Sequence, residues 1–474
     1  MTAFMMRRLT LIDQKHVAYF QSILTDDLVK QDPQTLESYG RDWTKKYKPQ
    51  ASVIVFPKST EQVAKILAYC SQEKLALVPS GGRTGLAGGA VALAGEVVLS
   101  LEKMNKILDI DPVNLTIKTE AGVTLQALQD AAKNNDLFFP LDLAAKGSCH
   151  IGGNIATNAG GLKFIRFGGA REQVLGLTVV LADGKILNLD SRVRKDNTGY
   201  DLKQWFIGSE GTLGIITEAS LKLSPKPQST QLCFLGLNSC DDILAIVSTC
   251  HKQQISITAC EYFGTEALDI VLGQFEQLQN PFESTYPFYL LLEVEGGNEE
   301  MLESFLEPMF NKGYIMDAII PQSSAQINDL WAIREYIPEA LFSSGPLRKN
   351  DISIPISSLP KFEHDLQECF SKAALPVKMV SFGHVGDGNL HINYLGAKEM
   401  SQADFYKQTD QLEKDVYQLV KSYNGSISAE HGIGILKKND LPFSRSPLEL
   451  ELMRKIKSIF DPDSILNPGK LIDL

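Results

Sequence analysis

Three glycine-rich segments in the first half of the chain constrain its fold more than any other feature. The first, residues 79–89 (PSGGRTGLAGG), follows the apolar run 75–78, which predicts a short buried strand. Glycine tolerates positive φ and lets another molecule approach the backbone. Consecutive N–H groups exposed in this way form a concave surface that suits phosphate oxygens. Arg83 and Thr84 add a cation and a hydroxyl at the same turn.

The two later segments favour a bound ligand over a merely flexible loop. They are residues 147–161 (GSCHIGGNIATNAGG) and 208–216 (GSEGTLGII). Glycine richness by itself is typical of a flexible loop. The chain contains no Gly-x-x-x-x-Gly-Lys-Ser/Thr and no Gly-x-Gly-x-x-Gly, which disfavours an ATPase and a nicotinamide Rossmann domain. Three such segments therefore indicate one long ligand with a diphosphate in its middle.

Composition disfavours several classes of partner. A chain of 474 residues is long enough for two or three domains, and its net charge of −11 disfavours nucleic acid and anionic membrane surfaces. Its 7 cysteines are scattered without a Cys-x-x-Cys, which favours reduced thiols. No uncharged apolar run approaches the roughly 20 residues that span a bilayer. We therefore expect a soluble cytoplasmic protein, with peripheral association at the inner membrane left open.

The order of predicted elements favours an α/β first part and an α+β second part. Residues 1–45 suggest a helical lead-in, strand 52–57 follows, and Ser59 with Gln62 forms a capping box that predicts a helix start. Periodicity breaks at 224–227 (SPKP), which predicts a domain boundary. Later strands are expected at 231–237, 256–263 and 288–294, and later helices at about 241–253, 402–423 and 446–460.

Residues 381–394 carry the clearest chemistry of the second half. Apolar residues before the turn 386–388 (GDG) and alternation after it predict two strands joined tightly. Such a turn brings His384 and His391 toward each other, and Asn393 shares a strand face with His391. Two histidines across a turn are more often ordinary hydrogen-bonding residues than metal ligands.

Residues 429–434 (AEHGIG) strengthen the case for a metal. They add a carboxylate, Glu430, and another imidazole, His431, between small residues. Two histidines and one glutamate are a common ligand set that leaves a metal position open for substrate. An inert structural site would normally be closed by a fourth side chain.

The glycine segments resemble the FAD-contacting segments of the vanillyl-alcohol oxidase / p-cresol methylhydroxylase flavoprotein superfamily. Residues 383–391 (GHVGDGNLH) and 429–434 resemble its FAD-linked D-2-hydroxyacid dehydrogenases, most closely the D-2-hydroxyglutarate dehydrogenase branch, and the similarity runs from about residue 39 to 470. The resemblance implies an α+β protein with a two-part FAD-binding domain, an α+β substrate (cap) domain and a C-terminal helical segment that returns to the flavin domain. We expect these parts at 1–45 (helical lead-in), 46–225 (FAD), 226–425 (cap) and 426–474 (C-terminal segment).

The same resemblance assigns site residues. His384, His391 and Glu430 would bind a divalent metal, with zinc preferred, and His431 would be the general base and contact substrate. Substrate carboxylate would be bound by Arg334 and Lys349, with Asn393 nearby; without the resemblance, a solvated helix face and an exposed loop would be the better interpretations. Non-covalent FAD would be held by Pro79, Ser80, Gly81, Gly82, Arg83, Thr84, Gly85, Leu86, Gly147, Ser148, Gly152, Gly153, Asn154, Thr157, Asn158, Gly160, Gly161, Glu210, Gly211, Gly214, Ile216 and Asn467.

The implied reaction is hydride transfer from the α-carbon of a D-2-hydroxy acid to flavin N5, with D-2-hydroxyglutarate favoured as substrate. D-lactate oxidation and a non-redox flavin-dependent transferase are the alternatives. Pro338 stands where related enzymes carry a hydroxyl residue, which bears on binding the second carboxylate of hydroxyglutarate. An electron-transfer flavoprotein or a quinone-linked chain is the implied electron acceptor, and a homodimer is compatible with the family.

Overall fold

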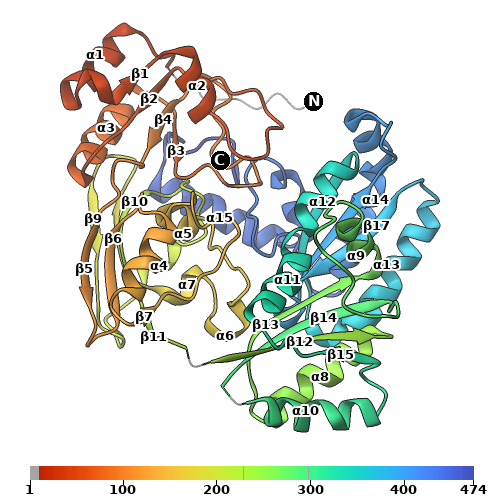
Figure 1. Ribbon diagram of the computed structural model, residues 1–474. Helices are drawn as coiled ribbons and strands as arrows, with labels where there is room; N and C mark the ends of the chain where they lie inside the picture. Colours follow the sequence, from red (N-terminus) through yellow and green to blue (C-terminus); the bar gives the residue numbers. More distant parts are fainter. Residues whose placement is uncertain (1–9, 228, 297) are drawn as a thin grey trace. The chain divides into compact units, whose positions relative to one another are not determined.

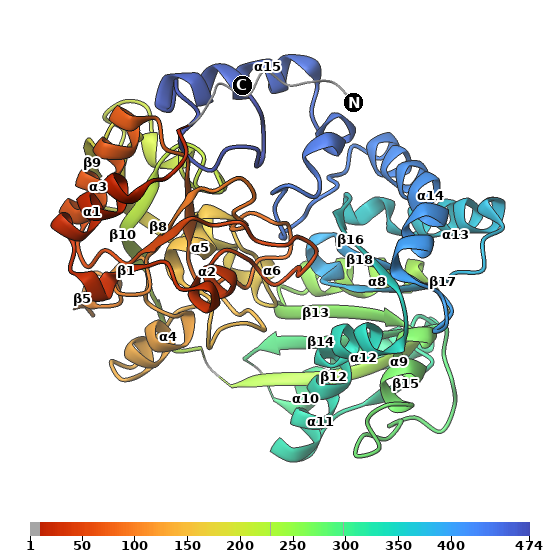
Figure 2. The same cartoon turned by 90° about the horizontal axis from the view of Figure 1, so that it is seen from above.

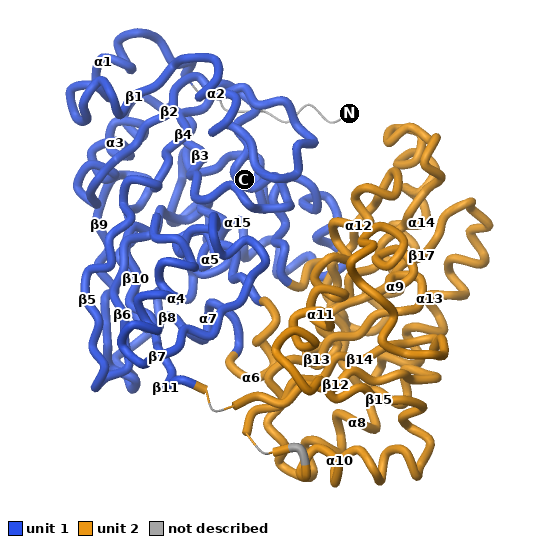
Figure 3. The backbone as a smooth tube through the Cα atoms, in the orientation of Figure 1, with its two compact units in different colours: residues 1–160, 168–226, 430–474 blue, residues 161–167, 227–429 orange. Residues whose placement is uncertain are grey.

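The computed structural model describes residues 10–227, 229–296 and 298–474 (Figure 1). The chain forms two compact units (Figure 3). Unit 1 comprises the residues up to Gly160 together with 168–226 and 430–474, and unit 2 comprises 161–167 and 227–429. The finer division into four parts expected from the sequence remains a prediction.

The first sheet of unit 1 has the strand order β1-β2-β4-β3. Its parallel strands β2 (Val53–Val55), β4 (Val97–Ser100) and β3 (Leu77–Ser80) are almost entirely buried, as continuous apolar runs require. Helix α3 (Thr60–Glu73) begins at Ser59, whose side chain accepts the N–H of Gln62, so the predicted helix start is confirmed. The described part of the lead-in contains α1 (Gln14–Ile23) and α2 (Pro33–Tyr39). It also contains an unexpected strand, β1 (Val29–Lys30), which pairs with β2.

The second sheet of unit 1 is antiparallel, with the order β5-β6-β10-β8-β9. Its strands are β5 (Ile107–Asp111), β6 (Thr116–Glu120), β8 (Val174–Val180), β9 (Ile186–Leu189) and β10 (Ile215–Lys222). Helices α4 (Leu125–Lys133), α5 (Ile151–Ala156) and α7 (Ala170–Gln173) belong to the same unit. The segment 224–227, where periodicity breaks, begins with a short strand, β11 (Ser224–Pro225), paired with β7 (Leu137–Phe138), and the two units divide after Lys226.

The C-terminal segment completes unit 1, as the fold prediction required. Helix α15 (Pro447–Phe460) starts with the capping box of Ser446 and Glu449, and its Ile456 and Phe460 pack on the core of the second sheet. The Nζ of Lys457 donates to the carbonyls of Thr212 (2.7 Å) and Leu466 (2.9 Å). These contacts fix the segment because each buried polar group finds a partner.

Unit 2 is built on one antiparallel sheet of seven strands, β15-β12-β14-β13-β17-β18-β16. In Figure 2 its strands β13, β14 and β12 run side by side. The strands are β12 (Thr230–Leu237), β13 (Ser256–Gly264), β14 (Phe288–Glu295), β15 (Asp317–Ile319), β16 (Leu347–Ser353), β17 (Lys378–Gly383) and β18 (Asn389–Leu395).

Helices cover both faces of this sheet. On one face, α9 (Thr265–Leu272), α11 (Ser324–Glu335) and α12 (Ile337–Ser344) share a hydrophobic core with Phe234, Phe263 and Phe382. The remaining α-helices of unit 2 are α6 (Phe164–Phe167), α8 (Cys240–Lys252), α10 (Glu299–Asn311), α13 (Leu359–Ala373) and α14 (Gln402–Ser422). The α+β class is confirmed, and among the described residues no helix is both long and apolar enough to cross a membrane.

Candidate active site

The three glycine segments line one pocket of unit 1. The pocket has a volume of about 950 Å³, counted with the space that opens to solvent. The lining residues expected from the sequence are Pro79, Ser80, Gly81, Gly82, Arg83, Thr84, Gly85, Gly152, Gly153, Asn154, Thr157, Glu210, Gly211, Gly214 and Ile216.

Seven of the expected residues do not line this pocket: Leu86, Gly147, Ser148, Asn158, Gly160, Gly161 and Asn467. Asn467 has another position, because its Nδ2 donates to the carbonyls of Gly89 (2.9 Å) and Glu210 (2.7 Å) and so ties two of the loops together. Lining residues that the sequence did not single out for the cofactor are Ala87, Gly89, Ala90, Leu101, Ala121, Cys149, His150, Ala156, Ile215 and His431. Several of them lie inside the glycine segments, whereas Leu101 and Ala121 lie outside any motif that the sequence shows.

Glycine plays two different roles around this pocket. A Cβ on Gly82 would lie 2.0 Å from the Ser148 carbonyl oxygen, and one on Gly152 would lie 2.6 Å from the Cβ of Ala121. These two glycines therefore let the loops pack against one another. A Cβ on Gly153 would meet no described atom within 4 Å, so this backbone faces open space. A ligand can approach the chain there.

Buried polar atoms in the lining fit a polar ligand. Within the described chain, Ser80 Oγ, His150 Nδ1 and Asn154 Oδ1 are buried without a hydrogen-bond partner. Burial, with the Arg83 charge as a smaller cause, lowers the pKa of His150, so its ring is neutral near pH 7. Buried polar groups normally have partners. A bound molecule with hydroxyl, amide and phosphate groups would supply them.

The loop that carries His431 is held by Glu210. The two carboxylate oxygens of Glu210 accept the N–H groups of Ile433 and Gly434, both at 2.8 Å. Burial raises the pKa of Glu210, while these two hydrogen bonds lower it. Both carboxylate oxygens of Glu210 are therefore used to orient the loop. His431 lines the pocket, and its Nε2 lies 3.8 Å from Glu430 Oε1.

In unit 2 the predicted hairpin is confirmed: β17 and β18 are antiparallel partners, and the His384 and His391 rings lie 5.4 Å apart. Across the sheet, His391 stands opposite Asp351 on β16, and Asn393 stands opposite Lys349. Cross-strand partners share a face, so these four side chains project from the same side of the sheet. Lys349 is exposed. It lies on strand β16, whereas the residue types alone favoured an exposed loop.

Arg334 is buried, only 5% exposed, and not on a solvated helix face. Its Nε and Nη2 donate to Glu261 Oε2 at 2.9 and 2.7 Å, and its guanidinium carbon lies 4.8 Å from the centre of the Phe382 ring. Helix α11 ends just after Arg334 because Pro338, the second residue of α12, has no N–H to donate to the Arg334 carbonyl. The Glu261 partner was missed, since one acidic residue within an apolar strand gives no sequence signal.

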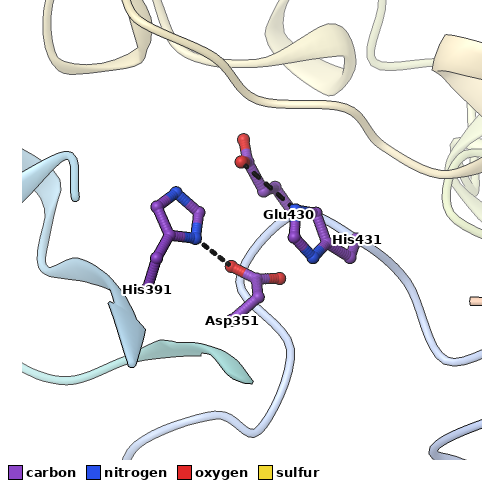
Figure 4. A group of neighbouring side chains, drawn as sticks. All are labelled: Asp351, His391, Glu430 and His431. Carbon is purple, nitrogen blue, oxygen red and sulfur yellow. Dashed lines mark ion pairs between the residues drawn. The ribbon is translucent and has the colours of Figure 1, made fainter. Parts of the chain in front are cut away.

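Asp351 is a further residue that the sequence did not single out. It is 1% exposed, its Oδ1 accepts the amide of Asn389 at 2.8 Å, and its Oδ2 accepts the N–H of Ala429 at 3.1 Å. Figure 4 marks two ion pairs, Asp351 with His391 (3.8 Å) and Glu430 with His431. Each pair joins a carboxylate to an imidazole, two groups of the kind that bind divalent metals.

Comparisons with known proteins identify the family. A model of the FAD binding domain matches residues 51–190, and one of the C-terminal domain of FAD linked oxidases matches 226–471. The chain is 45% identical to the D-2-hydroxyglutarate dehydrogenase of Xanthomonas citri pv. viticola, over 94% of each chain. It is 43% identical to that of Stutzerimonas stutzeri, over 93% of this chain and 95% of the relative. The chain belongs to the FAD-linked D-2-hydroxyacid dehydrogenases.

Family membership makes the chain an enzyme that uses FAD to oxidise a D-2-hydroxy acid, a small-molecule substrate. Its fold matches p-cresol methylhydroxylase with substrate bound at a TM-score of 0.78, 18% identity, and coverage of 97% of this chain and 96% of that one. The predicted superfamily fold of this dehydrogenase is confirmed. The roles of individual site residues remain predictions.

Proposed function

We propose that this dehydrogenase oxidises D-2-hydroxyglutarate to 2-oxoglutarate. The observation that carries the proposal is the similarity, over more than nine-tenths of each chain, to two bacterial enzymes named for that substrate. The number of candidate cations is a weaker argument for a substrate with two carboxylates, because Glu261 already neutralises the charge of Arg334. Lys349 shares a sheet face with Asn393 and is exposed, so it is our candidate partner for the second carboxylate.

FAD fits the pocket of unit 1 and would be held there without a covalent bond. Ser80, His150 and Asn154 have buried polar atoms that lack partners among the described residues, and Gly153 leaves its backbone open to a ligand. When bound, FAD supplies the two-electron acceptor at N5. The chain's contribution is to hold it and to exclude water from the reacting carbon.

We propose His384, His391 and Glu430 as the ligands of a divalent metal, and the Asp351 carboxylate beside His391 as a further candidate. Glu430 directly follows Ala429, whose N–H donates to Asp351, so chain continuity supports its inclusion. Zinc accepts this mixture of imidazole and carboxylate. It would polarise the substrate hydroxyl and lower the pKa of that group.

His431 is our proposed general base. The hydroxyl proton of the substrate passes to His431, and the C2–H bond breaks with its electron pair leaving as hydride, so that a C=O bond forms. The base must be neutral and within hydrogen-bond reach of the hydroxyl. The Glu210 hydrogen bonds to Ile433 and Gly434 serve that positioning.

D-lactate is the second candidate substrate, and Pro338 is the observation that favours it. At the second position of α12 this residue offers neither a hydroxyl nor an N–H to a distal carboxylate. One hydrogen bond contributes about 1 kcal/mol. The similarity to two enzymes named for D-2-hydroxyglutarate outweighs this loss, so hydroxyglutarate remains our first choice.

We also propose an electron-transfer flavoprotein or a quinone-linked chain as the electron acceptor. We further propose a cytoplasmic location, which the scattered cysteines favour, with peripheral contact at the inner membrane, and a homodimer.

Anaerobic reduction of the flavin tests the substrate. D-2-hydroxyglutarate should bleach the flavin absorbance, its L-enantiomer should not, and D-lactate should react with a lower kcat/KM. Lys349→Ala should lower kcat/KM for hydroxyglutarate far more than for lactate. A tenfold or greater preference of the wild type for D-lactate would show that the substrate is wrong.

A further inference from the structure

One buried carboxylate joins a substrate-binding candidate to a metal-ligand candidate in unit 2. Glu261, on β13, has 0% exposure. Its Oε2 accepts from Arg334 Nε (2.9 Å) and Nη2 (2.7 Å), and its Oε1 lies 2.7 Å from His384 Nδ1. Arg334 and His384 follow Glu261 by 73 and 123 residues in the sequence, so the tertiary fold assembles the group.

Glu261 is ionised in this environment. Its Oε2 accepts two N–H groups of the Arg334 guanidinium, which is always charged, and this ion pair keeps the carboxyl deprotonated. A carboxylate can only accept hydrogen bonds. Therefore Nδ1 of His384 donates a hydrogen to Glu261, and Nε2 is the ring nitrogen that a metal would use.

The same carboxylate fixes the orientation of the arginine. It occupies one edge of the planar guanidinium, formed by Nε and Nη2. The fork geometry of arginine leaves the second edge, formed by Nη1 and Nη2, for another carboxylate. Stacking of Arg334 on the Phe382 ring restricts its rotation further.

We infer that Glu261 is a positioning residue that sets both the substrate-facing edge of Arg334 and the metal-facing nitrogen of His384. The inference rests on the proposed function, because it assumes that the acid and the metal bind at these two side chains. Carboxylates behind a metal-bound histidine typically change metal affinity or activity by roughly 10- to 100-fold when they are lost.

Glu261→Gln is the informative variant, and Glu293→Gln is its matched control. Glutamine keeps the shape, but its one carbonyl oxygen cannot serve both His384 and Arg334. Glu293 lies on the neighbouring strand β14, on the same face of the sheet, is 8% exposed, and binds Lys163 and Thr258 instead. Both variants remove one buried negative charge, so a general loss of stability should affect them alike.

The flavin-loaded proteins are stripped of metal with a chelator, and the affinity for zinc alone is measured by competition with a chelating dye. We expect Glu261→Gln to weaken zinc binding roughly 10- to 100-fold, and to raise KM for the D-2-hydroxy acid about tenfold. Glu293→Gln should change both by less than about threefold. Equal zinc affinity and equal KM in Glu261→Gln and wild type, or equal losses in both variants, would overturn the inference.

Two further outcomes separate this inference from the proposed function. If wild type binds no zinc, the metal part of that proposal fails, and KM for whichever D-2-hydroxy acid reduces the flavin decides the role of Glu261. If Glu261→Gln does not fold, Glu261→Asp keeps the charge that Arg334 needs but shortens the reach. It should then show the same two losses at smaller size, and wild-type values in it would refute the inference.

Discussion

Single carboxylates decide what the basic groups of each unit can do. Glu261 holds Arg334 and His384 in unit 2, and Glu210 holds the backbone of the His431 loop in unit 1. Both are almost fully buried. Burying a carboxylate is unfavourable unless it is hydrogen-bonded, so each of these two carboxylates can stay buried only while its partners are in place.

His431→Ala tests the proposed base. Removing the proton acceptor should lower kcat by roughly 10²–10⁴ while the flavin stays bound, since general base catalysis supplies that much. Anaerobic single-turnover reduction of the flavin measures the loss directly. The control is His364→Ala on α13, whose side chain is 70% exposed. A loss below tenfold in His431→Ala would assign the base to another group.

At the scale of elements, the turn after β3 and the helix α5 both line the pocket that we propose for the flavin. Their glycines act differently, since Gly82 and Gly152 allow close packing and Gly153 faces open space. The side chains near the pocket that could bond a flavin covalently include Cys149 and His150. Burial raises the pKa of the Cys149 thiol, which makes it a poor nucleophile.

We therefore expect the flavin to be held without a covalent link. The turn 79–89 has no His, Cys or Tyr side chain to attach it. Precipitation of the protein with acid should release all the yellow colour into the supernatant. Colour retained in the pellet would contradict this, and Cys149→Ala and His150→Ala would then identify the attachment point.

At the scale of the whole molecule, unit 1 is assembled from both ends of the chain. Leu466 forms a β-bridge with Leu77 of β3. The side-chain amide of Asn467 donates to two backbone carbonyls, and a hydrocarbon side chain at this position would offer no donor to them. Near the C-terminus Lys470, 2% exposed, lies 3.9 Å from Glu96. Stability of this unit thus depends on residues close to the end of the sequence.

Lys470 makes the free energy of unfolding depend on pH. Burial lowers its pKa to about 8, against about 10.4 for an unfolded chain. Between these values the unfolded chain binds more protons, so this lysine makes the unfolding free energy rise with pH, by at most about 1.4 kcal/mol per pH unit. Lys470→Met lacks the contribution. Denaturant unfolding at several pH values should show wild type gaining on the variant from pH 8 to 10, and a constant difference would refute the assignment.

The sequence by itself determined the features that depend on local chemistry. Capping residues such as Ser59 and Ser446 predicted helix starts because the cap bonds lie within one turn. The hairpin that brings His384 and His391 together followed from alternation around the glycine turn at 386–388. Glycine segments predicted the pocket because no other residue permits such close backbone approach.

Only the tertiary structure decided which charges meet. Glu261 and Asp351 lie in strands whose pattern gives no warning of them, and their partners come from distant segments. The strand Val29–Lys30 forms only because β2 is there to pair with it, so local propensity could not reveal it. Likewise Arg334 lies on a helix whose sequence favours a solvated face, yet it is buried because the Glu261 carboxylate stabilises its charge away from water. Long-range pairing of this kind depends on the register of the whole sheet, which no local segment encodes.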